Sequence, residues 1–331
     1  MVAPQLGSGA VDAGAHTKEV TIDFLVQDRN PSQGGTTGLD QSLDLSNDTE
    51  PATAPCRLAV FLAHGTHLGV VLRRGPSAWA QLAVWDRKTD HFTPGQWFHG
   101  RVHERRCDLS TDGRLFVYFA CKHGPRRDDE GIGECWTAIS RPPYFTALAL
   151  WPNLGAWYGG GVFTSDRDLL LDASCGLEPH PKHRPPRRLR VAALPGDTAP
   201  WEQRLLRDGW RLMERGFDPR THRRIGRREI WEKTHRDGAL KLCCEIADVD
   251  FRRYGGPYSS SYWLETGSEL IPIPGADWVD WESGSRITFA RDGKLFAAEL
   301  RGDDLGEGVL LFDFNPLQPD QVASPDRARR W

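Results

Sequence analysis

A short turn of the form Asp-Gly-x-Leu recurs along the chain, and this repeat restricts the possible folds more than any other feature. It stands at residues 112–115, 237–240 and 292–295, with a looser copy at 166–169 and a further candidate at 64–68. Glycine supplies the positive φ of a tight hairpin and aspartate bonds the neighbouring amides, so each copy predicts two antiparallel strands. Successive copies start 48, 54, 71 and 55 residues apart. Such periods favour a β-propeller, whose four-stranded blades need about 40–45 residues each.

Each turn is followed, after a variable loop, by a further segment rich in β-branched or aromatic residues. These segments are 80–86, 147–152, 189–194, 260–264 and 308–313. We therefore predict an all-β propeller, with five four-stranded blades over residues 57–318. In the oversized third interval, the spacing of Leu205 and Trp210 predicts a short helix, with a turn to strand at Trp210 as the alternative.

The two ends of the chain differ from this β-rich centre. Residues 1–55 carry six Asp and two Glu against one Lys and one Arg, among many small polar residues. Such a segment cannot bury enough apolar surface to offset its chain entropy, which predicts a disordered acidic tail over residues 1–56. The extension 319–331 is polar except near its last residue, Trp331, which we expect to dock.

Two sequence patterns resemble a known family. The segment Asp108-Leu-Ser-Thr-Asp-Gly-Arg-Leu-Phe-Val-Tyr118 resembles the Ser-Pro-Asp-Gly turn of WD40-like bacterial β-propellers. The segments Ala83-Val-Trp-Asp86 and Ala149-Leu-Trp-Pro152 are similar to the Trp-Asp strand ends of that family. The resemblance covers most of residues 57–315 and extends to bacterial propeller proteins with segments like Asp277-Trp-Val-Asp-Trp281, but it carries no function.

Arginine precedes a Gly-Pro or Pro-Pro pair more often than chance allows. About one residue in nine is Arg, so the five such pairs should follow an Arg about 0.5 times in total, whereas three do. We expect these arginines shortly before the third strand of each blade, with two looser counterparts. The candidate binding residues are Arg74, Arg141, Arg184, Arg253 and Arg301.

Two interpretations of these arginines remain open. As the resemblance implies, equivalent loops would surround the channel mouth, where guanidinium groups would form a ring that binds carboxylate or phosphate. Alternatively, each Arg pairs with an acidic group of the next blade and holds the blades together. Two basic loops form a secondary set of candidates: Arg187, Arg188, Arg223, Arg224, Arg227 and Arg228.

The charge distribution favours a protein or another anionic partner over nucleic acid. Outside the acidic tail the net charge is only +3, whereas a nucleic-acid binder usually has a basic bias over the whole domain. The leading prediction is a non-catalytic interaction scaffold that presents its arginines to such a partner. The alternative is a carbohydrate-active enzyme or a lectin that uses the channel mouth.

Catalytic and metal-binding patterns are weak. A glycosidase needs two carboxylates roughly 5–9.5 Å apart, and the acids expected on inner strands are few: Glu104, Asp108, Glu229 and Glu232. The pairs His64/His67, His99/His103 and His180/His183 lack a recognisable third ligand, so we predict no metal and no cofactor.

The compartment is expected to be the cytoplasm. Seven irregularly spaced cysteines argue against a disulfide framework. The start of the chain lacks the pattern of a secretory signal, and no apolar run is long enough to cross a membrane, so no membrane contact is expected.

Overall fold

The computed structural model describes residues 54–331 except 124–130, 174–175, 197, 218–226, 237, 239, 249–257, 268 and 302–303. These residues belong to one compact unit, 51–331. The predicted acidic tail lies outside the described residues up to position 53.

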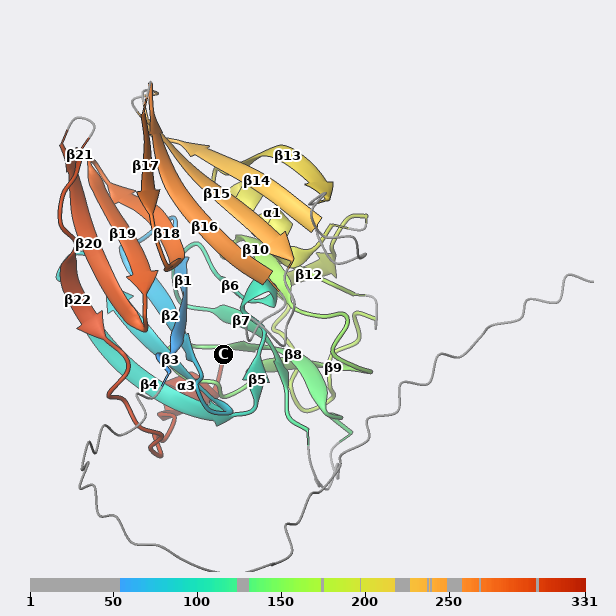
Figure 1. The fold of residues 1–331 in the computed structure, drawn as a ribbon. Coiled ribbons are helices and arrows are strands. Elements are labelled where there is room, and N and C mark those ends of the chain that lie inside the picture. The colour runs from blue at the N-terminus through green and yellow to red at the C-terminus, as the bar shows by residue number, and fades with distance from the viewer. Residues whose placement is uncertain are drawn as a thin grey trace, which may run out of the picture. The chain divides into compact units, whose positions relative to one another are not determined.

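Five β-sheets follow one another along the chain (Figure 1). Sheet 1 is an antiparallel meander of β1 (Arg57–Leu62), β2 (Leu68–Arg74), β3 (Trp79–Asp86) and β4 (His91–His99). Sheet 2 contains β5 (Arg101–Val102), β6 (Asp108–Leu109), β7 (Phe116–Cys121), β8 (Cys135–Ser140) and β9 (Ala149–Asn153). The short β5 and β6 both pair with β7 and are separated by the 3₁₀ turn η1 (Glu104–Arg106).

The remaining sheets vary more in size. Sheet 3 has only β10 (Gly161–Ser165), β11 (Asp168–Leu171) and β12 (Arg190–Ala193), and β12 runs parallel to β11. Sheet 4 is formed by β13 (Arg211–Phe217), β14 (Arg227–Thr234), β15 (Leu240–Asp248), β16 (Tyr258–Thr266) and β17 (Glu269–Ile273). Sheet 5 is formed by β18 (Ala276–Ser283), β19 (Arg286–Arg291), β20 (Lys294–Arg301), β21 (Asp304–Leu305) and β22 (Val309–Asp313).

The last sheet closes onto the first, which makes the fold a five-bladed β-propeller. Strands β18 and β19 contact β1. One apolar cluster takes Val71 and Trp85 from sheet 1 and Ala290 and Leu295 from sheet 5. The all-β, five-bladed prediction is confirmed, although the sheets have three to five strands where four were expected in each.

The repeated turn does mark hairpins, but these hairpins are not equivalent. Gly113 (φ 74°) and Gly293 (φ 71°) have the left-handed conformation that the sequence pattern requires. A Cβ on Gly293 would lie 2.3 Å from Oδ1 of Asn315, so this position has no room for a side chain. The turn at 112–115 joins β6 to β7, and β6 lies with β5 along one edge of sheet 2, whereas the turn at 292–295 joins β19 to β20, the second and third strands of sheet 5. The sequence period is therefore not the period of the blades.

A helix takes the place of sheet-on-sheet packing beside sheet 3. Helix α1 (Pro200–Arg207) packs Trp201 against Trp231 of sheet 4, with 5.9 Å between ring centroids, and Leu205 joins the same apolar cluster. Its other side contacts β10 and η1. The predicted helix is confirmed, and the chain then enters strand β13 just after Trp210.

The C-terminal segment runs from sheet 5 back across sheets 1 and 2. Arg73 donates to the carbonyl of Phe314 (3.0 Å), and Gln96 donates to the carbonyl of Val322 (2.9 Å). A short helix, α3 (Asp326–Arg329), precedes the last residue. The indole N–H of Trp331 donates to the carbonyls of Leu148 and Arg184, each at 3.1 Å, so the expectation that it docks is confirmed.

Candidate functional site

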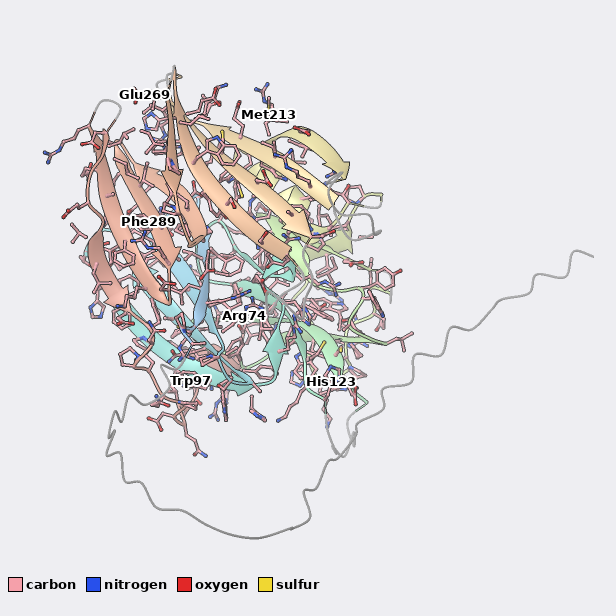
Figure 2. The ribbon with its side chains drawn as sticks, in the orientation of Figure 1. Arg74, Trp97, His123, Met213, Glu269 and Phe289 are labelled. Carbon is pink, nitrogen blue, oxygen red and sulfur yellow. The ribbon has the colours of Figure 1, made fainter. Side chains whose placement is uncertain are left out.

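A cavity of about 820 Å³ opens where the ends of sheets 1 and 2 meet. Its wall is formed by the start of β1, the β2–β3 turn, the junction of β4 with β5, η1 and the end of β7, with Asp248 and Tyr258 added from sheet 4. Figure 2 labels Arg74 and His123, which both line it. We call it the basic cavity, because its lining contains six cationic side chains: Arg57, Arg74, Arg101, Arg105, Arg106 and Lys122.

Among the residues that the structure describes, the lining contains two carboxylates, Glu104 and Asp248. Glu104 is held by Arg74, with Nη1 and Oε2 2.7 Å apart, and it also accepts the hydroxyl hydrogen bond of Tyr258. Even with this pair neutralised, cations outnumber anions in the wall. Guanidinium groups grip planar anions with two parallel hydrogen bonds, so the wall is suited to carboxylate or phosphate.

Arg105 lies at the inner end of the basic cavity. Its guanidinium carbon is 3.2 Å from the ring centroid of Tyr258 and 4.8 Å from that of Trp201, so two aromatic faces hold the charge. Burial lowers the pKa of Arg105 to about 10, which leaves it charged at neutral pH. Its Nη2 atom is buried and has no hydrogen-bond partner within the described part of the chain. A buried cationic donor without an acceptor is costly, and an anionic ligand group would satisfy it.

Glu104, Arg105 and Tyr258 also separate the basic cavity from a deeper one. The second cavity holds about 120 Å³ and is lined by residues of β1, α1, β16 and β18. All three residues line both spaces. They form the wall between the open cavity and the interior of the propeller.

His103 is neutral at physiological pH. Burial lowers its pKa to about 3, and the charges of Arg101, Arg106 and Arg74 act in the same direction. Its ring packs on Phe119, with 5.3 Å between centroids, and its buried Nε2 atom has no hydrogen-bond partner among the residues described. The basic cavity thus offers one neutral ring nitrogen beside several fixed charges.

Of the five arginines predicted to surround one mouth, the four that the structure describes lie in different parts of the propeller. Arg74 ends β2, pairs in register with Arg57 and lines the basic cavity. Arg141 follows β8 and precedes β9, which is the fourth and last strand in the spatial order β5-β7-β8-β9, so the prediction that it precedes a third strand is wrong. The β8 strand begins at Cys135, beside the cavity-lining Cys121. Because a strand advances about 3.3 Å per residue, Arg141 lies about 20 Å further along it.

Arg301 lies at the far end of sheet 5. Cys56 at the start of β1 donates from its backbone N–H to Oδ1 of Asn315 (3.0 Å), beside the β19–β20 turn. Arg301 is the last residue of β20 and follows that turn by the length of the strand, about 23 Å at 3.3 Å per residue. It therefore lies away from Arg74.

Arg184 and Arg141 lie near the C-terminus. The Arg184 carbonyl accepts from Trp331 and its guanidinium pairs with Glu178 at 2.9 Å. Nε of Arg141 donates to the carbonyl of Arg330 at 3.4 Å. Arg253 lies outside the described residues.

The six secondary candidates also differ from one another in their surroundings. Arg187 and Arg188 are exposed. Arg228 forms ion pairs with Glu245 (2.7 Å) and Glu214 (3.5 Å). Arg227 is the first residue of β14, but its side chain is outside the described part, as are Arg223 and Arg224.

Most of the cationic lining was missed at the sequence level. Arg105 and Arg106 follow Glu104 in η1, and Arg57 and Arg101 each begin a strand beside the same opening. Their common signal is position: each lies at a strand end or turn next to the β4–β5 junction. The pattern Arg-Gly-Pro identifies Arg74 alone among these residues.

The acids considered for catalysis are held in ion pairs. Arg207 binds Asp108 through Nη1 (2.5 Å) and Nη2 (2.9 Å), and burial raises the pKa of Asp108 while Arg207 opposes that effect. Nε of Arg215 pairs with Glu229 at 2.8 Å. Glu232 accepts from Arg211 (2.8 Å) and Lys241 (3.0 Å).

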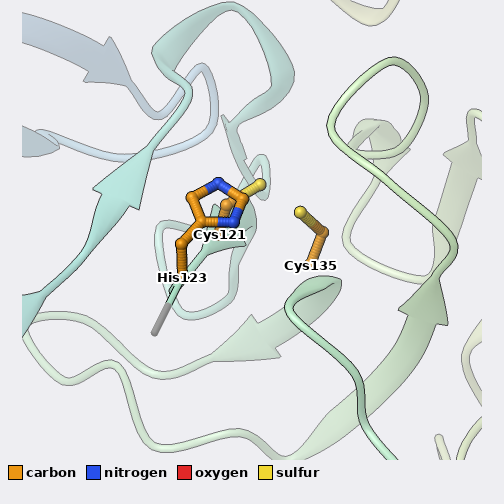
Figure 3. Close-up of side chains that lie close together, drawn as sticks. All are labelled: Cys121, His123 and Cys135. Carbon is orange, nitrogen blue, oxygen red and sulfur yellow. The ribbon is translucent and has the colours of Figure 1, made fainter. Parts of the chain in front are cut away.

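The three histidine pairs make separate contacts. His64 lies 2.7 Å from Oδ1 of Asp208, and His67 lies 3.6 Å from Oδ1 of Asp86. The ring of His99 packs on Trp79, and the rings of His180 and His183 are 5.6 Å apart. A different group of potential ligands, Cys121, His123 and Cys135, converges at the rim of the basic cavity (Figure 3).

No protein-family model matches the chain, and no curated protein matches it. Among solved structures, the chain is similar to the crystal structure of the WD40 domain of SCAP from fission yeast. That match has 8% sequence identity and a TM-score of 0.20, and it covers 82% of this chain and 58% of the other. The propeller assignment rests on the five sheets themselves. Within the described residues, no helix has the length and apolar character needed to cross a membrane.

Proposed function

We propose that this protein is a non-catalytic interaction scaffold whose basic cavity receives an acidic segment of a protein partner. WD40-like propellers commonly act as protein-interaction scaffolds. The observation that carries the proposal is the charge of the described cavity wall, where six cationic side chains and two carboxylates line the space. Such a wall raises the local concentration of anionic partners and favours their approach.

Exposed apolar side chains lie beside the same opening. The loop after β9 exposes Leu154, Trp157 and Tyr158, of which Trp157 is 84% exposed. Arg106, from the cavity wall, fixes this loop by donating to the carbonyls of Ala156 (2.8 Å) and Trp157 (2.5 Å). Aromatic and Arg side chains dominate the energetics of protein interfaces, so the charged cavity and this loop together fit a protein partner.

A carbohydrate ligand is the second candidate, and the exposed ring of Trp157 is the observation that favours it. Aromatic faces offer an apolar platform beside a polar edge. A lectin would bind neutral oligosaccharides on a glycan array, and Trp157→Ala would abolish that binding.

The test uses a fluorescein-labelled polyglutamate peptide and the full-length protein. Fluorescence anisotropy should show binding that weakens as salt rises, since exposed charges are screened. The double variant Arg57→Glu/Arg101→Glu should lower the affinity at least tenfold, because it reverses two exposed charges at the opening.

The matched control is Arg184→Glu/Arg301→Glu. It makes the same change in net charge at exposed positions away from the basic cavity and should alter the affinity less than twofold. Equal losses of affinity in both double variants would mean that the net charge of the protein, and not the basic cavity, attracts the peptide. Failure of the unaltered protein to bind the peptide would also overturn the proposal.

The proposal places the protein in the cytoplasm. Its support is that the six described cysteines are free and buried thiols. Reduced structural thiols of this kind are typical of a reducing compartment.

A further inference from the structure

We infer that Cys121, His123 and Cys135 form a binding site for a zinc ion at the rim of the basic cavity. One potential ligand atom from each residue lies within 4.8 Å of the other two. Figure 3 shows the three side chains converging from the end of β7 and the start of β8. Neither the propeller fold nor the proposed peptide site requires this arrangement.

Strand register brings the two thiols together. Cys121 is the last residue of β7, Cys135 is the first of β8, and the two are directly paired across the antiparallel ladder. Both side chains are buried, at 1% and 2% exposure, and they pack with Phe119. Paired residues in a ladder point to the same face, so both sulfurs are presented on one side of the sheet.

The backbone also sets the position of His123. Residues two apart in an extended chain point to the same side, which places His123 with Cys121. The pairing continues past the strand ends, because the Lys122 N–H donates to the Glu134 carbonyl at 2.8 Å. His123 is exposed, so a metal ion can reach the site from solvent.

Glu134 completes the environment of His123. Its Oε2 atom lies 2.8 Å from Nδ1 of the imidazole. In the tautomer whose Nδ1–H donates to this carboxylate, Nε2 keeps its lone pair, and ligand histidines in zinc sites usually have such a partner. The geometry therefore supplies two sulfurs, one ring nitrogen and an orienting carboxylate.

The ligand set favours Zn²⁺ among common divalent ions. Thiolate and imidazole ligands select zinc, whereas calcium and magnesium prefer oxygen. Two thiolates and a neutral imidazole balance the charge of Zn²⁺. In a tetrahedral site with Zn–S bonds of about 2.3 Å, the sulfurs lie about 3.8 Å apart, so small side-chain rotations close the site. Three protein ligands leave a fourth position open toward the cavity.

Cobalt provides a direct probe of this site. The full-length protein, freed of metal by a chelator and kept reduced, is titrated with Co²⁺. We expect one equivalent to produce the near-ultraviolet thiolate-to-cobalt band and the visible bands of tetrahedral cobalt. Zn²⁺ should then displace the cobalt, since it binds such sites more tightly.

The variants separate this site from other thiols. Cys121→Ser or Cys135→Ser should remove the thiolate band. His123→Ala changes an exposed residue, so the protein should still fold, and it should weaken Co²⁺ binding at least tenfold. Glu134→Gln should weaken it about tenfold. The matched control is Cys243→Ser/Cys244→Ser, which alters two buried thiols of sheet 4 and should leave the band unchanged.

Three results would overturn the inference. One is the absence of the thiolate band in the unaltered protein. Another is a band that survives both Cys121→Ser and His123→Ala. The third is a Cys121–Cys135 disulfide that peptide mapping still detects under the reducing conditions of the titration. None of these readouts depends on peptide binding, so they leave the proposed function to its own test.

Discussion

Two contacts between neighbouring sheets are stabilised by different interactions. One is the seam between sheets 1 and 5, and the other is the junction around helix α1. In the seam, Phe92 packs against Phe312 and Phe314, with ring centroids 4.9 and 5.8 Å apart. At the α1 junction, Arg207 binds buried Asp108 and the carbonyl of Phe163. Apolar contacts hold the seam, whereas the side of α1 that faces β6 and β10 is held by a buried ion pair.

The size of sheet 3 accounts for this difference. With three strands, one of them parallel, sheet 3 offers little surface for a neighbouring sheet, and α1 fills the space. The helix also supplies Arg204, which donates to the carbonyls of Glu104 and Cys107 and so supports η1. Because η1 carries Arg105, the polar junction also shapes the wall of the basic cavity.

The largest expected effect is in the seam. Trp85 is fully buried and stacks on Phe92, with centroids 5.7 Å apart. Trp85→Ala should lower the free energy of unfolding by about 4 kcal/mol, because it removes buried apolar area and leaves a cavity. Urea denaturation measures this loss. Trp157→Ala removes the same side chain from an exposed loop and should change the stability by less than about 0.5 kcal/mol.

The second prediction concerns the buried ion pair. Asp108→Ala should cost about 3 kcal/mol, because Arg207 loses its bidentate partner and keeps Asp208 (2.8 Å), and the Phe163 N–H loses its acceptor. The apolar double replacement Asp108→Leu/Arg207→Met should restore part of that loss, since an apolar pair needs no compensating charge and Asp208 keeps its contact with His64. Urea denaturation of the three proteins measures both values. If the double variant is less stable than Asp108→Ala, packing and not charge limits this junction.

The sequence predicts the apolar parts of the molecule better than the polar ones. The turn pattern at 112–115 and 292–295 predicts hairpins because a turn is a local property of four residues. It does not specify which two strands of a blade are joined, since that depends on the pairing of whole strands. The same limit explains why Arg141 and Arg301 were expected beside Arg74.

The candidate sites depend on strand pairing even more strongly than the connections between strands do. Cys121 and Cys135 are 14 residues apart in the chain and become neighbours only through the pairing of β7 with β8. Arg105 becomes part of a cavity wall only because Tyr258 and Trp201 come from distant segments. The Cys121-Lys-His123 spacing is the one local signal that could have suggested a ligand site.

The third prediction concerns the pH dependence of the free energy of unfolding, to which an aspartate beside the apolar seam contributes. Burial raises the pKa of Asp277 at the start of β18 to about 6, from an ordinary value of 3.8, while Arg57 opposes the shift. The folded protein therefore binds this proton more tightly than the unfolded chain does. The resulting stabilisation is complete below about pH 4 and is lost as the pH rises through about 6.

The size of this effect follows from the shift. About 1.4 kcal/mol per pKa unit gives up to about 3 kcal/mol, and partial exposure of the carboxylate reduces it to about 2 kcal/mol. Asp277→Asn should remove this contribution from the pH profile of unfolding measured between pH 4 and 7. An unchanged profile in the variant would mean that the carboxylate is well solvated.

The smallest expected effect tests how the C-terminal segment links the two regions. The segment leaves the seam at Phe314 and ends with Trp331 bonded to Leu148 and Arg184. Trp331→Ala should cost about 1–2 kcal/mol, since it removes a partly buried ring and leaves two carbonyls without their donor. Thermal unfolding measures the loss, and Trp331→Phe should recover the packing but not the hydrogen bonds.

The control for this last change is Arg330→Ala. Arg141 bonds the carbonyl of Arg330 and not its side chain, and that side chain is exposed. The control should therefore leave the stability unchanged within about 0.5 kcal/mol. If Trp331→Ala is equally harmless, the extension merely lies on the sheets. If it lowers stability as expected, the last residue reinforces the apolar cluster shared by sheets 2 and 3, at the end of a segment that begins at the seam.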